Sequence, residues 1–200
     1  IFDECTSGFR ETLGGLHKKC SVNPDIAIFG KALGNGFAIT AVVGKSDLMT
    51  ATNSSFISST FWTERIGPTA ALKTLEIMKR DKTYEYISEL GDYIKKGWLQ
   101  LAQRNKLPIK IFGLRSMPAF ELDYNYSHYF KTLITDRLLE KNIISTNSVY
   151  VSTAHTRDLA DQYLEELDKV FSEISIDTNP SRILSLIKEN PCQTTFERLN

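Results

Sequence analysis

The chain has 200 residues and carries 24 basic and 24 acidic side chains, so its formal net charge is zero, and 42% of its residues are hydrophobic. This balance is typical of a globular protein and excludes a disordered or fibrous chain. It offers no charged field for a nucleic acid or a membrane surface, and the sequence holds neither a run of about 18 apolar residues nor a charged-then-apolar leader. We therefore expect a cytoplasmic protein with no nucleic-acid or membrane partner.

The cysteine usage agrees with a reducing compartment. Cys5, Cys20 and Cys192 are odd in number and lack a CxxC spacing, so no disulfide framework is expected. Cys5, His17 and Cys20 lack a fourth ligand at a recognised spacing, so we interpret them as packed side chains and expect no metal.

The chain begins at Ile1 inside an apolar stretch, IFDE, and has no initiator Met. A strand at the first residue has no upstream partner, so we interpret the chain as a piece of a longer one. Its 200 residues are enough for one domain and part of another.

The first 80 residues favour strands followed by a helix. A short strand ends at Asp3, and a glycine-containing loop follows it. Residues 25–30 follow the turn signals Asn23 and Pro24 and are a second strand candidate. Residues 38–45 are a third, since they are rich in β-branched and small residues. Residues 67–79 have apolar side chains at helical spacing, which predicts a helix.

A different pattern follows the polar stretch KRDKT, so we place a domain boundary near residues 80–83. The expected elements are a helix over 83–105, strands over 109–116 and 118–124, a helix over 128–141, a strand over 149–153 and a helix over 157–172. Apolar side chains recur every three or four residues in the first of these helices, which predicts a core-facing stripe. This order of elements is typical of a compact α+β unit.

The sequence therefore predicts two domains, over residues 1–80 and 81–175, and a tail over 176–200. The tail contains a short apolar helix candidate at 181–189, and its role cannot be read from the sequence.

Lys31 stands at the end of the apolar run DIAIFG and is followed by a glycine-rich stretch. A lysine is costly to bury as a cation, so it lies either at the surface or in a cleft that holds its amine neutral. Position alone favours the surface.

Three stretches together resemble the class III aminotransferases, the fold-type I pyridoxal-phosphate enzymes that include glutamate-1-semialdehyde aminomutase. They are IFDECTSGFR, DIAIFGKALGNGFAITAVVG and SSTFWTERIGPTAALKTLE, and the resemblance extends from residue 1 to about residue 175. It implies an α/β chain that comprises the C-terminal part of the cofactor-binding large domain, followed by an α+β small domain. It also implies that the cofactor's phosphate loop and the aromatic residue stacked on its ring belong to the family's N-terminal half, outside this sequence.

The resemblance assigns roles to three residues and implies pyridoxal 5'-phosphate as cofactor. Asp3 matches the aspartate that keeps the cofactor's pyridine nitrogen protonated, so that the ring can accept electrons. Lys31 matches the lysine that forms the Schiff base and moves protons as general base and acid. Thr60 resembles the threonine that reaches the cofactor phosphate of the neighbouring subunit, which implies a homodimer with shared active sites.

The implied function is transamination from an amino-acid donor to a carbonyl acceptor. The aminomutase, which shifts an amino group within one molecule, is the first alternative. In the aminomutase an SGNP-like stretch follows the threonine, whereas FWTERIGP follows Thr60 here, and this departure favours a plain aminotransferase. A non-catalytic remnant that acts as an assembly partner is the second alternative.

Five further residues admit two interpretations each. Gly34 and Gly36 suit a tight turn beside a cofactor or a purely structural turn. Glu4 and Arg10 suit an orienting contact or a substrate contact. Arg115 is a forked donor that suits a substrate carboxylate or a surface position, and the surface is favoured.

Overall fold

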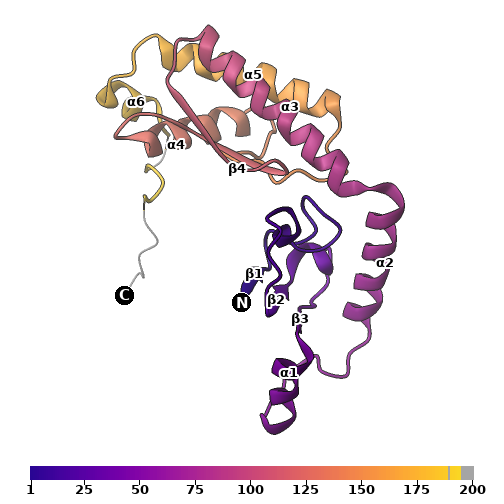
Figure 1. Cartoon of the computed structure of the whole chain (residues 1–200). Helices are drawn as coiled ribbons and strands as arrows, with labels where there is room; N and C mark the ends of the chain where they lie inside the picture. Colours follow the sequence, from indigo (N-terminus) through magenta and orange to yellow (C-terminus); the bar gives the residue numbers. More distant parts are fainter. Residues whose placement is uncertain (189, 195–200) are drawn as a thin grey trace. The chain divides into compact units, whose positions relative to one another are not determined.

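A computed structural model describes residues 1–188 and 190–194 of the chain (Figure 1). The chain divides into two compact units, Ile1–Ser88 and Glu89–Asn200, which we call unit 1 and unit 2. The division falls within helix α3 (Thr83–Arg104). Among the described residues, no helix combines the length and the apolar character needed to cross a bilayer.

Unit 1 contains a three-stranded sheet in the order β1-β2-β3. The strands are β1 (Phe2–Glu4), β2 (Ile26–Phe29) and β3 (Ala41–Gly44). β1 is parallel to β2, and β2 is antiparallel to β3. The bounds of all three strands differ by only a few residues from those of the strands predicted from the sequence.

The core of unit 1 lies on one face of this sheet. Ala27 and Phe29 alternate with half-buried isoleucines along β2, so that a single face is buried. The rings of Phe9 and Phe29 lie 5.3 Å apart between centroids. Helix α2 (Ile66–Asp81) adds Ala71 to the same core. The helix predicted from the sequence therefore packs against the apolar face of the sheet.

Short helices connect the longer elements of unit 1, and the sequence pattern does not predict them. They are η1 (Leu16–Lys19), η2 (Lys31–Leu33), α1 (Ser46–Met49) and η3 (Thr50–Ser54). Each is five residues or fewer, too short for hydrophobic periodicity to be visible.

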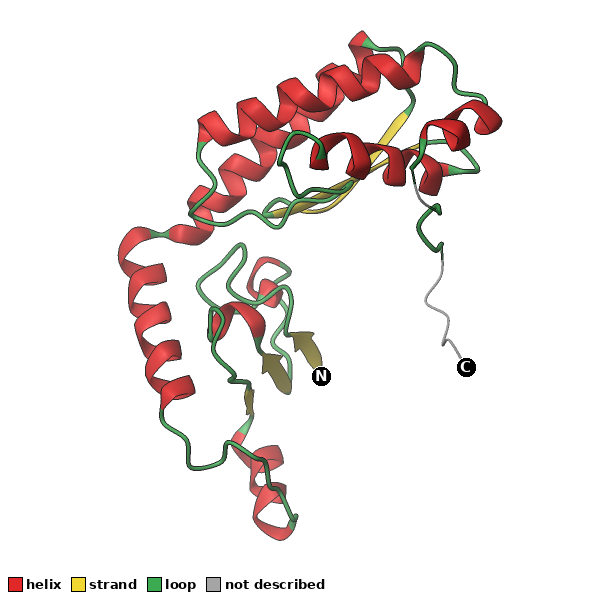
Figure 2. Cartoon of the chain, turned by 180° about the vertical axis from the view of Figure 1, so that it is seen from behind, coloured by secondary structure: helices red, strands yellow, loops and turns green. Residues whose placement is uncertain are grey.

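Unit 2 has a β-hairpin and helices, as predicted (Figure 2). The elements after α3 are β4 (Ile109–Leu114), β5 (Met117–Leu122), α4 (Ser127–Leu139), α5 (Arg157–Ser175) and α6 (Pro180–Leu186). β4 and β5 are antiparallel. α3 and α5 lie side by side, and hydrogen bonds join them, for example from Arg104 to Asp168.

Aromatic side chains fill the core of unit 2. Trp98, Phe120 and Phe171 are fully buried, and the rings of Trp98 and Phe120 lie 4.7 Å apart. The indole Nε1 of Trp98 donates a hydrogen bond of 3.0 Å to the hydroxyl of Tyr163. Burial raises the pKa of Tyr163, so its hydroxyl stays protonated in the core.

The strand predicted over residues 149–153 is wrong. Only an isolated bridge pairs Ser148 with Ala119 of β5, although Val149 and Val151 donate to the carbonyls of Pro118 and Ser116 at 3.0 Å. An antiparallel ladder needs the reciprocal bond from residue 118 to the carbonyl of Val149. Pro118 has no N–H, so the ladder stops there.

The tail folds back onto unit 2 as far as it is described. The side chain of Asn179 caps α6 by accepting from Ser181 N at 2.9 Å, and Pro180 occupies the first helical turn. Ile183 is fully buried. The helix ends at Leu186, earlier than the predicted 189, and residues 189 and 195–200 of the predicted tail lie outside the described residues.

Candidate active site

The candidate site lies where β1 and β2 end. Their parallel register pairs Asp3 with Ile28 and Glu4 with Phe29, so the chain leaves both strands at the same edge of the sheet. Cys5 and Thr6 follow one strand, and Lys31 follows the other after one glycine. The carboxyl ends of parallel strands are where open α/β sheets bind ligands.

Asp3 presents an exposed carboxylate at this edge. Its Oδ1 accepts a hydrogen bond of 3.0 Å from the backbone N–H of Cys5. This bond, the Cys5 side chain and the positive charge of Lys31 hold the pKa of Asp3 below its ordinary value. The carboxylate is therefore ionised at neutral pH. Lys31 is close enough to act on it electrostatically.

Lys31 begins η2 in an unusual backbone conformation. Its φ is 38°, in the left-handed region that residues other than glycine rarely adopt. The N–H of Asn35 binds the Lys31 carbonyl at 3.0 Å and fixes this turn. The side chain is exposed, and its Nζ donates a hydrogen bond to Oγ1 of Thr6. The structure thus brings Lys31 and Asp3 to one sheet edge, with Lys31 at the surface of this chain.

The glycines after Lys31 serve the turn itself. Gly36 has a φ of 104°, and a Cβ on Gly34 would lie 2.2 Å from the carbonyl oxygen of Phe37. Neither position accepts a side chain without a change of the backbone. The structural interpretation of both glycines is therefore sufficient.

Glu4 anchors the loop that follows β1. It is 2% exposed, and its carboxylate accepts from the hydroxyl of Ser7, from His17 N at 3.0 Å and from His17 Nδ1 at 3.1 Å. Burial alone would raise the pKa of Glu4, but these hydrogen bonds outweigh it and lower the pKa. Glu4 thus makes an orienting contact, one of the two roles left open by the sequence.

Arg10 and Arg115, the two arginines singled out in the sequence, make contacts within their own units. Arg10 Nε donates to the carbonyl of Thr6 at 3.4 Å, within the same loop. Arg115, in the β4–β5 turn of unit 2, binds Asp92 of α3 at 2.7 Å. Its observed partner is therefore a surface carboxylate of α3. In the ranges 1–188 and 190–194, no group of three or more His, Cys, Asp or Glu side chains could hold a metal ion.

Thr60 is the third residue to which the resemblance assigns a role, after Asp3 and Lys31. It is exposed, in the loop before α2, and within the described residues no hydrogen bond or ion pair joins it to Asp3 or Lys31. The unusual stretch after it has a local role, because the carboxylate of Glu64 accepts from Ile66 N and from Gly67 N at 3.0 Å. Glu64 satisfies the free N–H groups at the start of α2.

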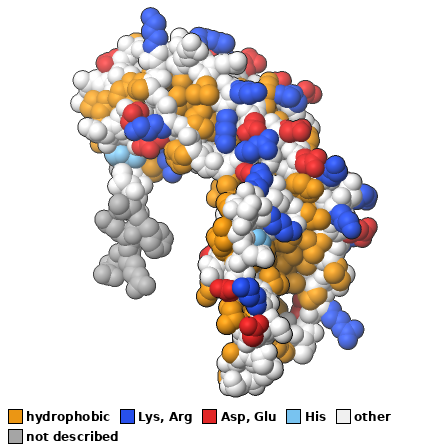
Figure 3. Space-filling model, in the orientation of Figure 1, with side chains coloured by type: hydrophobic (Ala, Val, Ile, Leu, Met, Phe, Trp, Pro, Cys, Tyr) orange, Lys and Arg blue, Asp and Glu red, His pale blue; other side chains and the backbone are white. Residues whose placement is uncertain are grey.

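Large apolar side chains surround Thr60 in the sequence and are exposed in unit 1. They are Phe56, Ile57, Phe61, Trp62 and Ile66. Hydrophobic side chains are visible on the surface of this unit in Figure 3. Exposure of this much apolar area is typical of a surface that another protein segment covers.

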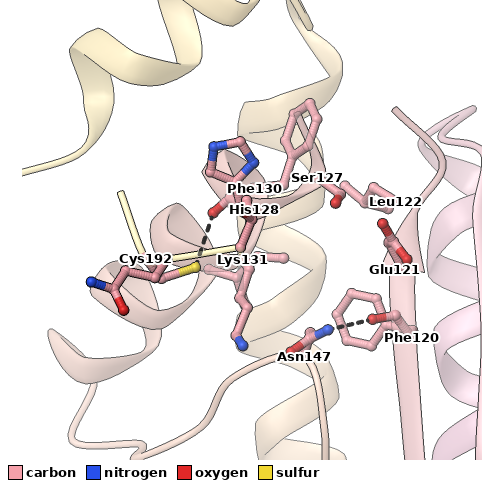
Figure 4. A pocket seen from close by; sticks show the side chains of 12 residues that line it. Phe120, Glu121, Leu122, Ser127, His128, Phe130, Lys131, Asn147 and Cys192 are labelled. Carbon is pink, nitrogen blue, oxygen red and sulfur yellow. Dashed lines mark hydrogen bonds between the residues drawn. The ribbon is translucent and has the colours of Figure 1, made fainter. Parts of the chain in front are cut away.

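A separate pocket of about 180 Å³ lies in unit 2, between β5, α4 and the segment around Cys192 (Figure 4). Cys192 Sγ donates to the carbonyl of His128 at 3.5 Å, and Asn147 Nδ2 donates to the carbonyl of Phe120 at 2.7 Å. None of the predicted site residues lines this pocket. All the residues that line it belong to unit 2.

Sequence reasoning missed two residues at the site. Thr6 contacts Lys31, which is 25 residues away in the sequence. His17 contacts Glu4, which is 13 residues away. No local periodicity joins such distant positions. The sequence signal that could have found Thr6 is its place directly after β1, at the edge where β2 also ends.

Comparison with known proteins gives a consistent result. Residues 1–171 match the family described as Aminotransferase class-III. The chain is 35% identical over 167 residues to 3-aminobutyryl-CoA aminotransferase of Cloacimonas acidaminovorans, covering 80% of this chain and 40% of that protein. It is 32% identical over 181 residues to glutamate-1-semialdehyde 2,1-aminomutase of Methanothrix thermoacetophila, covering 82% of this chain and 42% of that protein. The chain thus spans less than half the length of these relatives.

A solved structure shares the fold. The FumI protein of Sphingopyxis sp. MTA144, in its pyridoxal-phosphate internal aldimine form, matches with a TM-score of 0.81 and 25% identity, over 91% of this chain and 45% of that one. The chain therefore has the architecture of about half of a fold-type I enzyme.

Proposed function

The chain belongs to the class-III aminotransferase family, and from that premise we propose that it is part of a pyridoxal-phosphate-dependent transaminase. The enzyme moves an amino group from a small-molecule amino-acid donor to a carbonyl acceptor. Lys31 carries the cofactor as a Schiff base, and Asp3 is its second catalytic contact.

The observation that carries this proposal is the placement of Asp3 and Lys31 at the ends of two adjacent parallel strands. The chemistry of these groups fits the cofactor. An ionised carboxylate is what a protonated pyridine nitrogen requires, and a primary amine is what an aldehyde requires. The phosphate loop and the aromatic residue stacked on the ring would come from segments outside this sequence.

The two residues divide the chemical work. Pyridoxal phosphate, when bound, supplies an electron sink for a carbanion. Asp3 accepts a hydrogen bond at the ring nitrogen and holds a proton there. Once the substrate amine has displaced it from the Schiff base, Lys31 Nζ would act as general base and take the proton from the substrate α-carbon. It would then act as general acid and give the proton to the cofactor's C4′.

A second candidate function is the intramolecular amino shift of an aminomutase. The 32% identity to the Methanothrix aminomutase supports it. Transamination needs an external carbonyl acceptor and the shift does not, so dependence of turnover on an added 2-oxo acid separates the two. A non-catalytic remnant has no chemical need for both Asp3 and Lys31, which favours an enzyme.

The domain assignment is part of the proposal. Residues 1–80 belong to the cofactor-binding large domain, 81–175 to the small domain and 176–200 to an appended tail. In unit 1, a pocket of about 580 Å³ opens onto core side chains such as Phe29 and Leu33. An open apolar core supports the view that further parts of the family fold cover this unit in the complete protein.

A homodimer with shared active sites completes the proposal. The exposed apolar side chains around Thr60 support an interface there, with Thr60 directed to the cofactor phosphate of the neighbouring subunit. A cytoplasmic location rests on the cysteine usage, and Cys5, Cys20 and Cys192 are free thiols in the structure.

The experiment that tests the function is reductive trapping in the full-length enzyme. Purified enzyme loaded with pyridoxal phosphate is treated with borohydride, digested and analysed by mass spectrometry. We expect the pyridoxyl label on Lys31, and Lys31→Ala should abolish both label and turnover while the circular dichroism spectrum stays unchanged. A label on a different lysine would exclude the assignment.

A further inference from the structure

We propose that Thr6 is a positioning residue for Lys31: its hydroxyl holds and orients the free Nζ amine at the end of β2. The inference deepens the function proposed above and rests on it. The observation is a hydrogen bond from Lys31 Nζ to Thr6 Oγ1, which spans the two strand ends.

Thr6 is itself held in place. The N–H of Gly8 binds the carbonyl of Glu4 at 2.8 Å, which closes a tight turn with Thr6 inside it. Arg10 Nε donates to the Thr6 carbonyl at 3.4 Å. The side chain of threonine is β-branched and rotates little about χ1, so a fixed backbone here also fixes the hydroxyl.

Lys31 needs such a partner because its amine stands on a long flexible stem. The side chain is exposed, and Oδ1 of the nearby Asp3 is engaged by the N–H of Cys5. The left-handed turn at Lys31 sets the start of the stem, and the Thr6 hydroxyl sets its end. Two fixed points define the path of a chain that would otherwise sample many rotamers.

The choice of a hydroxyl matters for proton transfer. Elsewhere in unit 1, Lys45 forms an ion pair with the carboxylate of Asp25 at 2.6 Å. A hydroxyl is neutral and can both accept and donate a hydrogen bond. Thr6 can therefore form a hydrogen bond with Lys31 whether Nζ donates or accepts, as a residue that acts first as base and then as acid requires.

The test measures the amine directly, without cofactor and without turnover. The full-length protein without cofactor is methylated with limiting formaldehyde and cyanoborohydride, and the initial rate at Lys31 is divided by the rate at Lys45 from peptide mass spectrometry. The variants are Thr6→Val, which keeps the shape and removes the hydroxyl, and Thr6→Ser, which keeps the hydroxyl. Thr12→Val is the matched control, because the Thr12 hydroxyl binds the Gly15 carbonyl at 2.9 Å in the same loop.

The ratio should rise about fivefold in Thr6→Val, the order expected when one hydrogen bond to the amine is lost. Thr6→Ser and Thr12→Val should stay within about twofold of the parent, since the bond is retained in both. Circular dichroism of each variant confirms that the fold is intact.

The inference is overturned if Thr6→Val leaves the ratio unchanged, or if Thr12→Val changes it equally. Its failure is distinct from failure of the function. An unchanged ratio with pyridoxyl label on Lys31 removes only the role of Thr6. A changed ratio with the label on another lysine leaves the contact in place and removes its catalytic purpose, which overturns the inference together with the function.

Discussion

The carboxylate of Glu4 lies 3.1 Å from Nδ1 of His17, thirteen residues along the chain, and also accepts the backbone N–H of His17. One buried side chain thus ties the end of β1 to the start of η1. The loop between them contains Thr6, so the contact between Glu4 and His17 helps to fix the position of Thr6 in the candidate site.

We expect Glu4→Gln to destabilise the 200-residue chain by about 2 kcal/mol at pH 7. The buried carboxylate accepts several hydrogen bonds, and in glutamine one of its two acceptor oxygens is replaced by an NH2 group that can only donate. Urea unfolding followed by circular dichroism measures this. Glu76→Gln, which removes an exposed ion pair with Lys73, should change stability by less than about 0.5 kcal/mol and serves as control.

The same pair predicts a pH dependence. The folded-state pKa of Glu4 is lowered from 4.5, so its ionisation stabilises the folded protein above that value, and this contribution is lost as the pH falls through the folded-state pKa. The difference between parent and Glu4→Gln should therefore narrow below pH 4.5. A difference that stays constant down to pH 3 would contradict the assignment of the shift to Glu4.

We expect Pro118→Ala to extend the hydrogen bonding of β5. Residue 118 then has an N–H that can bind the carbonyl of Val149, the bond that proline prevents. Amide hydrogen exchange should show a protected amide at position 118. The gained bond and the lost rigidity of proline offset each other, so stability should change by less than about 1 kcal/mol.

We expect Asp3→Asn in the full-length enzyme to lower kcat and kcat/KM together, with little change in KM. The carboxylate acts on the electron sink, an effect felt mainly in the transition state. Steady-state kinetics measures this, and Asp25→Asn, at the other end of the sheet in an ion pair with Lys45, is the control. An unchanged kcat would remove the role of Asp3.

We expect mixed dimers of full-length Lys31→Ala and Thr60→Ala subunits to regain part of the activity. If Thr60 serves the partner's site, each heterodimer has one intact site and one doubly damaged site. If each chain used its own Thr60, every site would carry one lesion, and activity would not exceed the sum of the parents. Subunit mixing after mild unfolding, with an activity assay, distinguishes the two results.

Sequence reasoning was strongest where a pattern repeats. The stripe that contains Trp98 recurs every three or four residues and forms a core face as predicted. The strand over residues 149–153 failed because its pairing depended on Pro118, about thirty positions earlier, and propensity says nothing about the donor on a partner strand.

The site was predictable only in part. Asp3 and Lys31 stand out because each ends an apolar strand within a specific motif. The contacts of Thr6 and His17 depend on how a loop folds back, and no spacing in the sequence encodes that. The assigned role of Thr60 concerns a second subunit, so it stays a prediction.

The left-handed backbone at Lys31 has an evolutionary consequence. A glycine adopts a φ of 38° without the strain, of the order of 1 kcal/mol or more, that a lysine incurs there. Lys31→Gly should then raise the melting temperature of the chain while removing its amine. Selection for stability alone would discard this lysine. If Lys31 has the role proposed above, an effort to stabilise the chain by substitution should leave position 31 unchanged.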